Sequence, residues 1–277
     1  MTEWVDDRNV ALLTDLYELT MAASYFENGM NAPATFDLFI RDLPQERNFL
    51  VACGLEHALT YLEALRFEDE SLSYLRSLDL FTDRFLSFLG ELRFTGEVWA
   101  MPEGEIVFAA EPLVRVTAPL IEAQIVESFL MNCLTFQTMI ASKAARVAIA
   151  CGDRQFVDYS LRRDHGADAG LRAARAAFVG GASATSNLLA GKLFGIPVSG
   201  TMAHSYVMTF DSELSAFRAY AREFGDRTIL LIDTFDVEQG ARNAITIAKE
   251  TEARGTRIKG VRIDSGDLAT LTRTVRK

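Results

Sequence analysis

The sequence predicts an α/β fold, in which an incomplete (β/α) barrel of parallel strands follows an N-terminal α+β domain. Between residues 155 and 267, a short apolar run ends five times in a cluster of small, polar or charged residues, and a helix-like stretch follows each cluster. Repeated strand, polar turn and helix are typical of βα units on a parallel sheet. The part before about residue 115 instead mixes helical and alternating apolar spacing, which favours a separate α+β domain.

The N-terminal elements are predicted from this spacing. Residues 11–29 have the apolar period of a helix that stops at a glycine, and residues 34–40 alternate like a strand. Two stretches rich in Leu and Phe, 49–65 and 70–91, are predicted to be helices. Two strands are expected at 94–101 and 106–116, with Pro102-Glu103-Gly104 as the turn between them.

A long helix is predicted over residues 119–152. Pro119 suits its first turn and Gly152 its end. We expect it to connect an N-terminal domain, residues 1–118, to the barrel portion, residues 153–277.

The five strands of the barrel portion are expected at 155–158, 177–181, 197–200, 228–232 and 258–263. In parallel sheets and barrels, chemistry lies beyond the carboxyl ends of the strands, so the five polar clusters should converge on one pocket. Barrels of this kind close with about eight strands. Five leave an open edge, which is a liability for a free-standing protein.

Composition excludes several classes of function. The net charge of −10 argues against nucleic acid and anionic membrane surfaces as partners, although local arginines can still bind a phosphorylated substrate. No apolar run reaches 18 residues, and the N-terminal residues lack the apolar segment of a secretory signal. Cys53, Cys133 and Cys151 have no metal or redox spacing and favour buried free thiols, which fits a cytoplasmic protein.

His204 is the first candidate for chemistry, because it lies four residues past a glycine at a predicted strand end. A lone histidine is more often structural than catalytic, but the strand-end position of His204 favours a catalytic role. His57, on an apolar helix face, and His165, beside Asp164, are expected to be structural.

Two pairs of aspartates follow the last two predicted strands. Asp236 and Asp267 are explained as helix N-caps, each stabilising by roughly 1 kcal/mol. Asp233 and Asp264 end apolar runs instead, so their carboxylates are expected to face the pocket, where they can hold Mg²⁺ or ribose hydroxyls.

Arginines at strand ends indicate an anionic ligand. Arg162 and Arg163 follow the first predicted strand, and Arg262 interrupts the apolar fifth one. A cation at such a place is expected to bind a carboxylate or a phosphate. The turn that begins at Gly180 allows close backbone approach but is no phosphate loop by itself, and the chain has no Walker lysine motif, GxGxxG or HExxH.

Four motifs resemble those of a known enzyme family. They are LTDLY at 13–17, GGASATSN at 180–187, GTMAHS at 200–205 and VRIDSGD at 261–267. In this order the chain resembles nicotinate phosphoribosyltransferase over essentially its whole length. The resemblance implies condensation of nicotinate with phosphoribosyl pyrophosphate to nicotinate mononucleotide and pyrophosphate, driven by ATP hydrolysis through a phosphohistidine. It also implies Mg²⁺ and a homodimer with shared active sites.

The resemblance assigns catalytic and stacking roles. His204 would be the phosphorylated histidine, and Asp233 and Asp264 would orient ribose or Mg²⁺. Tyr17, from the neighbouring subunit, and Tyr159 would sandwich the pyridine ring. A related nicotinamide enzyme has Phe where Tyr159 stands.

The resemblance also assigns binding roles. Thr201 and Arg262 would bind the nicotinate carboxylate region, and Arg41 and Arg162 would reach phosphate groups. Ser205 and Asn187 complete the expected substrate-binding set. A flat aromatic carboxylate suits tyrosine faces and one arginine, and a cationic ribose transition state suits nearby carboxylates.

Alternatives stay open at this point. Members of the family are longer, and their later strands supply a glycine- and threonine-rich loop for the 5′-phosphate, so the resemblance implies that this chain is the N-terminal part of the enzyme. A non-catalytic fragment that associates with a partner chain is therefore one alternative. Nicotinamide or quinolinate phosphoribosyl transfer is another, although quinolinate has a second carboxylate and should need more basic residues than the strand ends carry.

Overall fold

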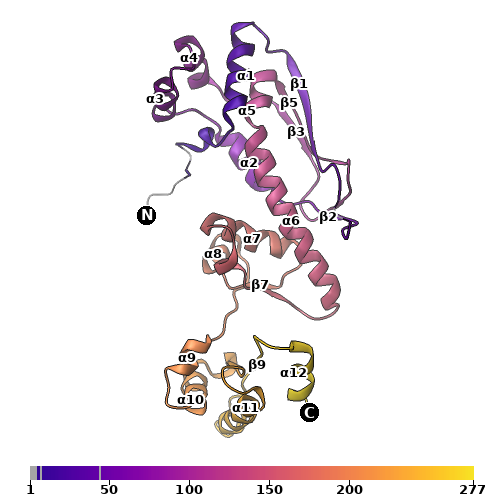
Figure 1. Ribbon diagram of the computed structural model, residues 1–277, viewed down its shortest axis with the longest axis vertical. Helices are drawn as coiled ribbons and strands as arrows, with labels where there is room; N and C mark the ends of the chain where they lie inside the picture. Colours follow the sequence, from indigo (N-terminus) through magenta and orange to yellow (C-terminus); the bar gives the residue numbers. More distant parts are fainter. Residues whose placement is uncertain (1–4, 7, 44) are drawn as a thin grey trace. The chain divides into compact units, whose positions relative to one another are not determined.

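The computed structural model describes residues 5–6, 8–43 and 45–277, and the chain divides into two compact units (Figure 1). The first is Met1–Val198 and the second is Ser199–Lys277. Each unit has buried apolar residues of its own. The division does not coincide with the expected boundaries after residues 118 and 152, which remain a prediction.

The first unit contains a three-stranded antiparallel sheet with strand order β1-β5-β3. The strands are β1 (Pro33–Phe39), β3 (Glu97–Ala100) and β5 (Pro112–Pro119). Helices α1 (Leu16–Glu27) and α5 (Leu120–Ile125) pack together, and α5 packs on the sheet (Figure 1). The predicted strand at 34–40 is confirmed, and so is the predicted helix near 11–29, although the 3₁₀ turn η1 (Val10–Leu12) precedes it.

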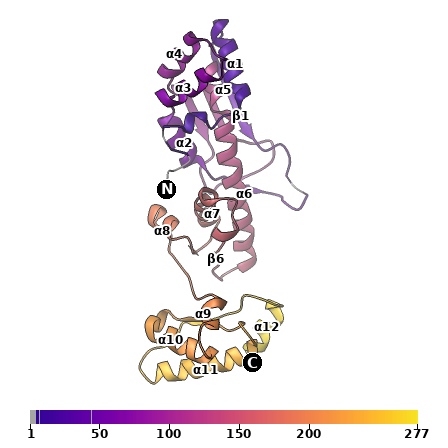
Figure 2. The same cartoon turned by 60° about the vertical axis from the view of Figure 1, so that its left-hand side comes forward.

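Three short helices complete the N-terminal part: α2 (Leu55–Ala64), α3 (Asp69–Ser77) and α4 (Asp83–Glu91) (Figure 2). The predicted single helix at 70–91 is wrong, because two features break it. Asp79 adopts a positive φ of 55°, and the Thr82 hydroxyl caps α4 by accepting from the Phe85 amide at 3.2 Å.

Two further predictions in this part are corrected. Residues 49–65 are not all helical, since β2 (Leu50–Val51) pairs antiparallel with β4 (Ile106–Val107) before α2 begins. The strand predicted at 106–116 is therefore two strands, β4 and β5, which belong to different sheets. Apolar residues buried on both sides do not distinguish a short strand from a helix by their spacing alone.

The helix predicted at 119–152 is divided into α5 and the long α6 (Glu127–Cys151). The break is at Val126, whose ψ of −6° departs from the helical value. Gly152 ends α6 as predicted, with a φ of 57° that favours glycine.

Two βα units close the first unit. They comprise β6 (Val157–Asp158), η2 (Leu161–Arg163), α7 (Ala167–Val179), β7 (Ala184–Thr185) and α8 (Leu188–Phe194). Strands β6 and β7 are parallel, and Val198 forms an isolated parallel bridge to Thr185.

The strand predicted at 177–181 is wrong, because these residues end α7. Ala173, Ala174, Ala176 and Ala177 are buried in this helix, and alanine has the highest helix propensity. Gly180 then passes so close to α6 that a Cβ would lie 2.3 Å from the Ala141 carbonyl oxygen.

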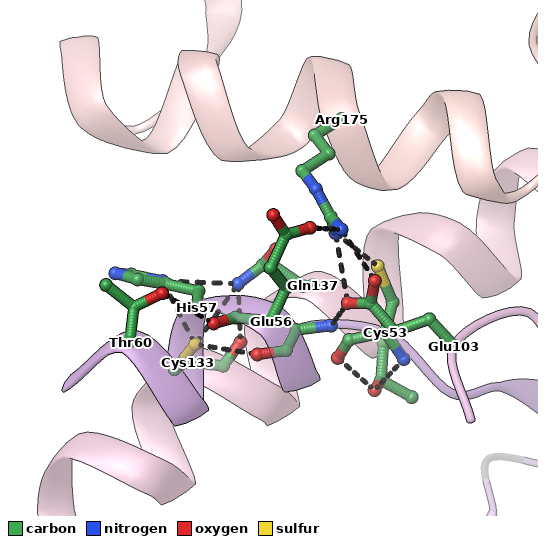
Figure 3. A network of polar contacts seen from close by, with 10 residues as sticks. Cys53, Glu56, His57, Thr60, Glu103, Cys133, Gln137 and Arg175 are labelled. Atoms are coloured by element: carbon green, nitrogen blue, oxygen red, sulfur yellow. Dashed lines mark hydrogen bonds and ion pairs between the residues drawn. The ribbon is translucent and has the colours of Figure 1, made fainter. Parts of the chain in front are cut away.

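An ion-pair network fastens α7 to the turn between β3 and β4 (Figure 3). Arg175 donates to both carboxylate oxygens of Glu103, at 3.0 and 2.6 Å, and also pairs with Glu56. Glu103 in turn accepts from the Gly54 amide at 2.6 Å, where α2 begins. The Arg175 side chain is only 15% exposed. The guanidinium that links these distant segments is therefore largely buried.

The second unit repeats strand and helix. Its elements are α9 (His204–Met208), α10 (Glu213–Phe224), η3 (Gly225–Arg227), β8 (Ile229–Leu231), α11 (Val237–Glu252), β9 (Gly260–Arg262) and α12 (Leu268–Val275). Strands β8 and β9 are parallel, with Leu230 opposite Val261. Phe217 on α10, Leu230 on β8 and Ile247 on α11 form a fully buried core.

The structure bears out part of the predicted fold class. The chain is a mixture of helices and strands, and the strands near 155–158, 228–232 and 258–263 form parallel pairs. The parallel strands of the described residues lie in separate two-stranded sheets, so the incomplete barrel stays a prediction. Among the described helices, none has the length and hydropathy needed to cross a bilayer.

Candidate functional site

The second unit brings four candidate residues together at the carboxyl ends of β8 and β9. Asp233 follows β8, Arg262 is the last residue of β9, and Asp264 comes two residues later. His204 is the first residue of α9. Because β8 and β9 are parallel neighbours, their carboxyl ends share one edge, as predicted for these residues.

His204 lies between a hydroxyl and a carboxylate. Its Nδ1 is 3.2 Å from the Thr234 hydroxyl, and its Nε2 is 3.6 Å from an oxygen of Asp264. The His204 side chain is 38% exposed, so the ring is held on two sides and remains accessible to a ligand.

Arg262 is fixed by two contacts. One Nη donates to Asp264 at 2.6 Å, and the other donates to the Met202 carbonyl oxygen at 3.0 Å. Its Nε is buried and has no partner among the described residues. A buried donor without a partner is costly, so the Arg262 side chain carries an unmet hydrogen-bond requirement at this edge of the guanidinium.

Asp233 accepts hydrogen bonds from the next strand end. One of its oxygens receives the Asp264 amide at 2.8 Å and the Ser265 hydroxyl at 2.7 Å. Burial raises the pKa of Asp233, but these bonds and the nearby His204 outweigh burial and lower the pKa below its usual value. The other oxygen is buried without a partner among the described residues.

The described residues contain no group of three or more His, Cys, Asp or Glu side chains that could hold a metal. Mg²⁺ commonly uses only one or two carboxylates together with substrate phosphates. The two carboxylates of Asp233 and Asp264 suit that type of site, and they do not form a metal site made of protein ligands alone.

Asp236 and Asp267 have the capping role predicted for them. Asp236 accepts from the Gln239 amide at 2.8 Å at the start of α11. Asp267 accepts from the amides of Ala269 and Thr270 at the start of α12. The capping prediction for these two aspartates is confirmed, and the prediction that Asp233 and Asp264 face a ligand pocket stays a prediction.

Thr201 and Ser205 flank the cluster in sequence. The half-buried Thr201 donates to the Met202 carbonyl oxygen at 3.3 Å, and Ser205 is exposed on the first turn of α9. Neither makes a described contact with Arg262. Their predicted contacts with substrate stay predictions.

Tyr17 belongs to the first unit. It lies on α1, is 45% exposed, and donates to Glu127 on α6 at 3.0 Å. Burial and the Glu127 carboxylate raise its pKa to about 12, so the phenol remains a donor. Tyr17 and Glu127 line an open hollow of about 590 Å³, which leaves the tyrosine ring available to a ligand or partner.

The other first-unit candidates lie on loops and short elements. Arg41 is exposed after β1, and Tyr159 and Arg162 are exposed after β6. Asn187 is buried and caps α8, because its side-chain oxygen accepts from the amides of Leu189 and Ala190 at 3.1 Å each. This capping role was missed by the sequence analysis.

Asp158 stabilises the turn after β6, and the sequence analysis also missed this role. Asp158 accepts from the Ser160 amide at 3.0 Å and from the Thr185 hydroxyl at 2.8 Å. The position of Asp158 at a predicted strand end was the available signal. Thr234 and Ser265 were missed in the second unit, although both stand beside aspartates that were singled out.

The candidate set is thus divided between the two units. The second unit contains Thr201, His204, Ser205, Asp233, Arg262 and Asp264. The first contains Tyr17, Arg41, Tyr159, Arg162 and Asn187. The structure joins His204, Asp233, Arg262 and Asp264, while convergence of the two sets on one pocket stays a prediction.

The family model and the curated relatives share one name. Residues 12–135 match the model of the nicotinate phosphoribosyltransferase N-terminal domain. The nicotinate phosphoribosyltransferase pncB2 of Mycobacterium tuberculosis is 48% identical over 266 residues, which are 96% of this chain and 57% of that protein. The nicotinate phosphoribosyltransferase of Bacillus subtilis is 46% identical over 275 residues, with 98% and 55% covered.

Two solved structures are similar to this chain. The crystal structure of human nicotinic acid phosphoribosyltransferase superposes with a TM-score of 0.87 at 32% identity, over 95% of this chain and 63% of that one. A nicotinate-nucleotide pyrophosphorylase from Pyrococcus furiosus has a TM-score of 0.81 at 22% identity, which shows similarity of fold alone. The chain spans little more than half the length of the curated relatives above.

Proposed function

Because the chain belongs to the nicotinate phosphoribosyltransferase family, we propose that the protein containing it condenses nicotinate with phosphoribosyl pyrophosphate in NAD biosynthesis. The products would be nicotinate mononucleotide and pyrophosphate. The observation that carries the proposal is the cluster of His204, Asp233, Arg262 and Asp264, within a chain 48% identical to a protein of that name.

We further propose that His204 carries a phosphoryl group from ATP. A lone pair of the ring would form the N–P bond while the bond from the γ-phosphorus to ADP breaks, and ADP would leave. The geometry supports this role, since the ring is accessible and a carboxylate lies 3.6 Å from Nε2, where it would stabilise positive charge on the phosphorylated ring.

Arg262 is proposed to bind the nicotinate carboxylate. Its side chain is 26% exposed and its guanidinium is the cation of the cluster, so it can donate to a carboxylate oxygen of the ligand. Tyr17 and Tyr159 would stack on the pyridine ring, with Tyr17 contributed by the second subunit of a homodimer.

Asp233 and Asp264 are proposed to act on the ribosyl group. Positive charge develops on the ribose as the bond to pyrophosphate breaks, and nearby carboxylates stabilise it. The lowered pKa of Asp233 keeps this carboxylate ionised at neutral pH. A bound Mg²⁺ would neutralise the charge of the pyrophosphate leaving group.

The test uses the purified protein and its His204→Ala variant. The wild type should form nicotinate mononucleotide and acquire acid-labile label from γ-labelled ATP, and the variant should lose the label. His165→Ala is the matched control, because His165 is exposed outside the cluster. Equal labelling of His204→Ala and wild type would contradict the phosphohistidine. Turnover of nicotinamide or quinolinate instead of nicotinate would contradict the substrate.

A further inference from the structure

Thr234 contacts His204 but has no part in the proposed function. It follows Asp233 at the carboxyl end of β8 and is half-buried. Its hydroxyl lies 3.2 Å from Nδ1 of His204, and no other described residue forms a hydrogen bond with that nitrogen. The opposite nitrogen, Nε2, faces Asp264 at 3.6 Å.

The two neighbours of the ring differ in what they can do chemically. A carboxylate only accepts hydrogen bonds, whereas a hydroxyl both donates and accepts. Asp264 is a carboxylate paired with the Arg262 guanidinium through its other oxygen, at 2.6 Å. The nitrogen that faces Asp264 is therefore the one that carries the proton, since a lone pair there would face a negative oxygen.

The proton on Nε2 determines the rest of the arrangement. In a neutral imidazole, the other nitrogen is then an acceptor. The Thr234 hydroxyl must donate to Nδ1, and it can do so because a hydroxyl hydrogen rotates to suit its partner. Thr234 and Asp264 thus specify the same tautomer from opposite sides of the ring.

We infer that Thr234 is a positioning residue that holds His204 in the Nε2–H tautomer and orients Nδ1 as its unprotonated nitrogen. The inference rests on the proposed function for its consequence in catalysis. When Nδ1 forms the bond to phosphorus and ADP leaves, Nε2 keeps its proton, and the resulting positive ring faces Asp264. The Thr234 hydroxyl is released from Nδ1 and becomes available to a phosphoryl oxygen.

The experiment combines NMR with labelling. Long-range ¹H–¹⁵N spectra of protein labelled at histidine report the tautomer of each ring, and His204→Ala assigns the signal among three histidines. Wild type and Thr234→Ser should show the Nε2–H tautomer. Thr234→Val has the same shape without the hydroxyl, so it should show a mixture of tautomers and phosphorylate at least about tenfold more slowly, as expected for loss of one hydrogen bond of about 1.4 kcal/mol.

Thr246→Val is the matched control. Thr246 lies in the same unit, on α11, where its hydroxyl donates to the Arg242 carbonyl oxygen at 3.0 Å. Its replacement should leave both the tautomer and the labelling rate unchanged. Thr234→Ser should restore both, which separates positioning from a general loss of packing.

The outcomes are distinguishable. An Nδ1–H tautomer in the wild type, or a Thr234→Val spectrum identical to wild type, would overturn the inference. If the tautomer responds as expected but no variant and no wild type acquires phosphate, the positioning by Thr234 stands and the proposed phosphorylation of His204 fails.

Discussion

At the scale of single residues, Arg262 and His57 illustrate two uses of a half-buried basic side chain. Arg262 is held by Asp264 and the Met202 carbonyl, and its Nε is buried without a partner among the described residues. His57, on α2, is instead held by protein contacts: its Nδ1 lies 3.1 Å from the Cys133 sulfur (Figure 3), and its ring meets Phe129 edge-on. The surroundings of Arg262 suit ligand binding, and the surroundings of His57 suit stability.

Arg262→Ala should raise the KM for nicotinate far more than the KM for ATP. Loss of a charge-assisted hydrogen bond costs roughly 1.5–3 kcal/mol, which corresponds to about 10- to 100-fold in affinity. Initial rates over a matrix of nicotinate and ATP concentrations measure both constants. A parallel rise of both would indicate that Arg262 is structural or binds phosphate.

His57 should make the protein less stable at mildly acidic pH. Burial, with the nearby positive charges of Arg172 and Arg175, lowers its pKa from 6.5 to about 4. Below pH 6.5 the unfolded chain takes up a proton that the folded ring refuses, so stability is lost as pH falls from 6.5 to about 4. After a discount for partial exposure, the loss is roughly 1–2 kcal/mol.

The measurement compares urea unfolding of wild type, His57→Gln and His165→Gln at several pH values. His57→Gln should flatten the pH dependence between 6.5 and 4, whereas His165→Gln, at an exposed position, should retain it. Identical pH profiles for wild type and His57→Gln would exclude the buried imidazole as the source.

At residue scale, the sequence was sufficient to separate the aspartates that cap a helix from the aspartates that end an apolar run. Asp233 and Asp264 end apolar runs, Asp236 and Asp267 precede helices, and the structure separates the two pairs in that way. Thr234 was not predicted, because a threonine at a strand end carries no signal until the ring of His204, 30 positions away, is placed beside it.

At the scale of elements, close approach between backbones decides which residues the units require. Gly240 on α11 lies over the end of β8, where a Cβ would be 2.1 Å from the Ile232 carbonyl oxygen. A Cβ added to Gly260, at the start of β9, would have no atom within 4 Å, and Gly260 has no positive φ. The two glycines therefore have different reasons for being glycine.

Gly240→Ala should destabilise the second unit by about 2–3 kcal/mol, because backbone against which α11 packs would have to move. Gly260→Ala is the matched control, and it should be neutral or stabilise by about 0.4–1 kcal/mol through the unfolded state. Denaturant unfolding of both variants provides the comparison. A Gly240→Ala protein as stable as Gly260→Ala would mean that α11 does not pack on β8 in this way.

Element predictions failed where tertiary contacts override local pattern. The stretch at 177–181 was expected to be a strand, but Gly180 ends α7 against the Ala141 carbonyl, and this contact is invisible in the sequence. The strand at 106–116 was likewise divided by pairing of β4 with β2, more than 50 residues earlier in the chain. Pairs such as β8 and β9 were predictable, since each lies within a run rich in apolar residues that is followed by an N-capped helix.

At the scale of the whole molecule, the candidate residues are divided between two units, each with its own core. The family resemblance, and no local spacing, is what assigned Tyr17 to a neighbouring subunit. The exposed Tyr17 ring, at the mouth of an open hollow on the first unit, is compatible with that assignment. We therefore propose a homodimer in which each active site takes Tyr17 from one chain and His204 from the other.

Shared sites make a quantitative prediction for mixed dimers. Tyr17→Ala and His204→Ala should each be nearly inactive alone. When the two variants are dissociated, mixed in equal amounts and reassociated at random, half of the dimers contain one chain of each kind. In such a dimer, one site combines both substitutions and the other has neither. Half of the dimers with half of their sites intact gives about one quarter of the wild-type activity.

The rival arrangement gives a different number. If Tyr17 served the site of its own chain, every site in a mixed dimer would contain one of the two substitutions, and mixing would restore nothing. Nicotinate mononucleotide formation before and after mixing distinguishes the two, with light scattering to verify that mixed dimers form. A mixture of Tyr17→Ala with Tyr17→Phe/His204→Ala controls for the hydroxyl that donates to Glu127. Its recovery should match that of the first mixture if Tyr17 acts through its ring face, since phenylalanine retains the face and loses only the hydrogen bond.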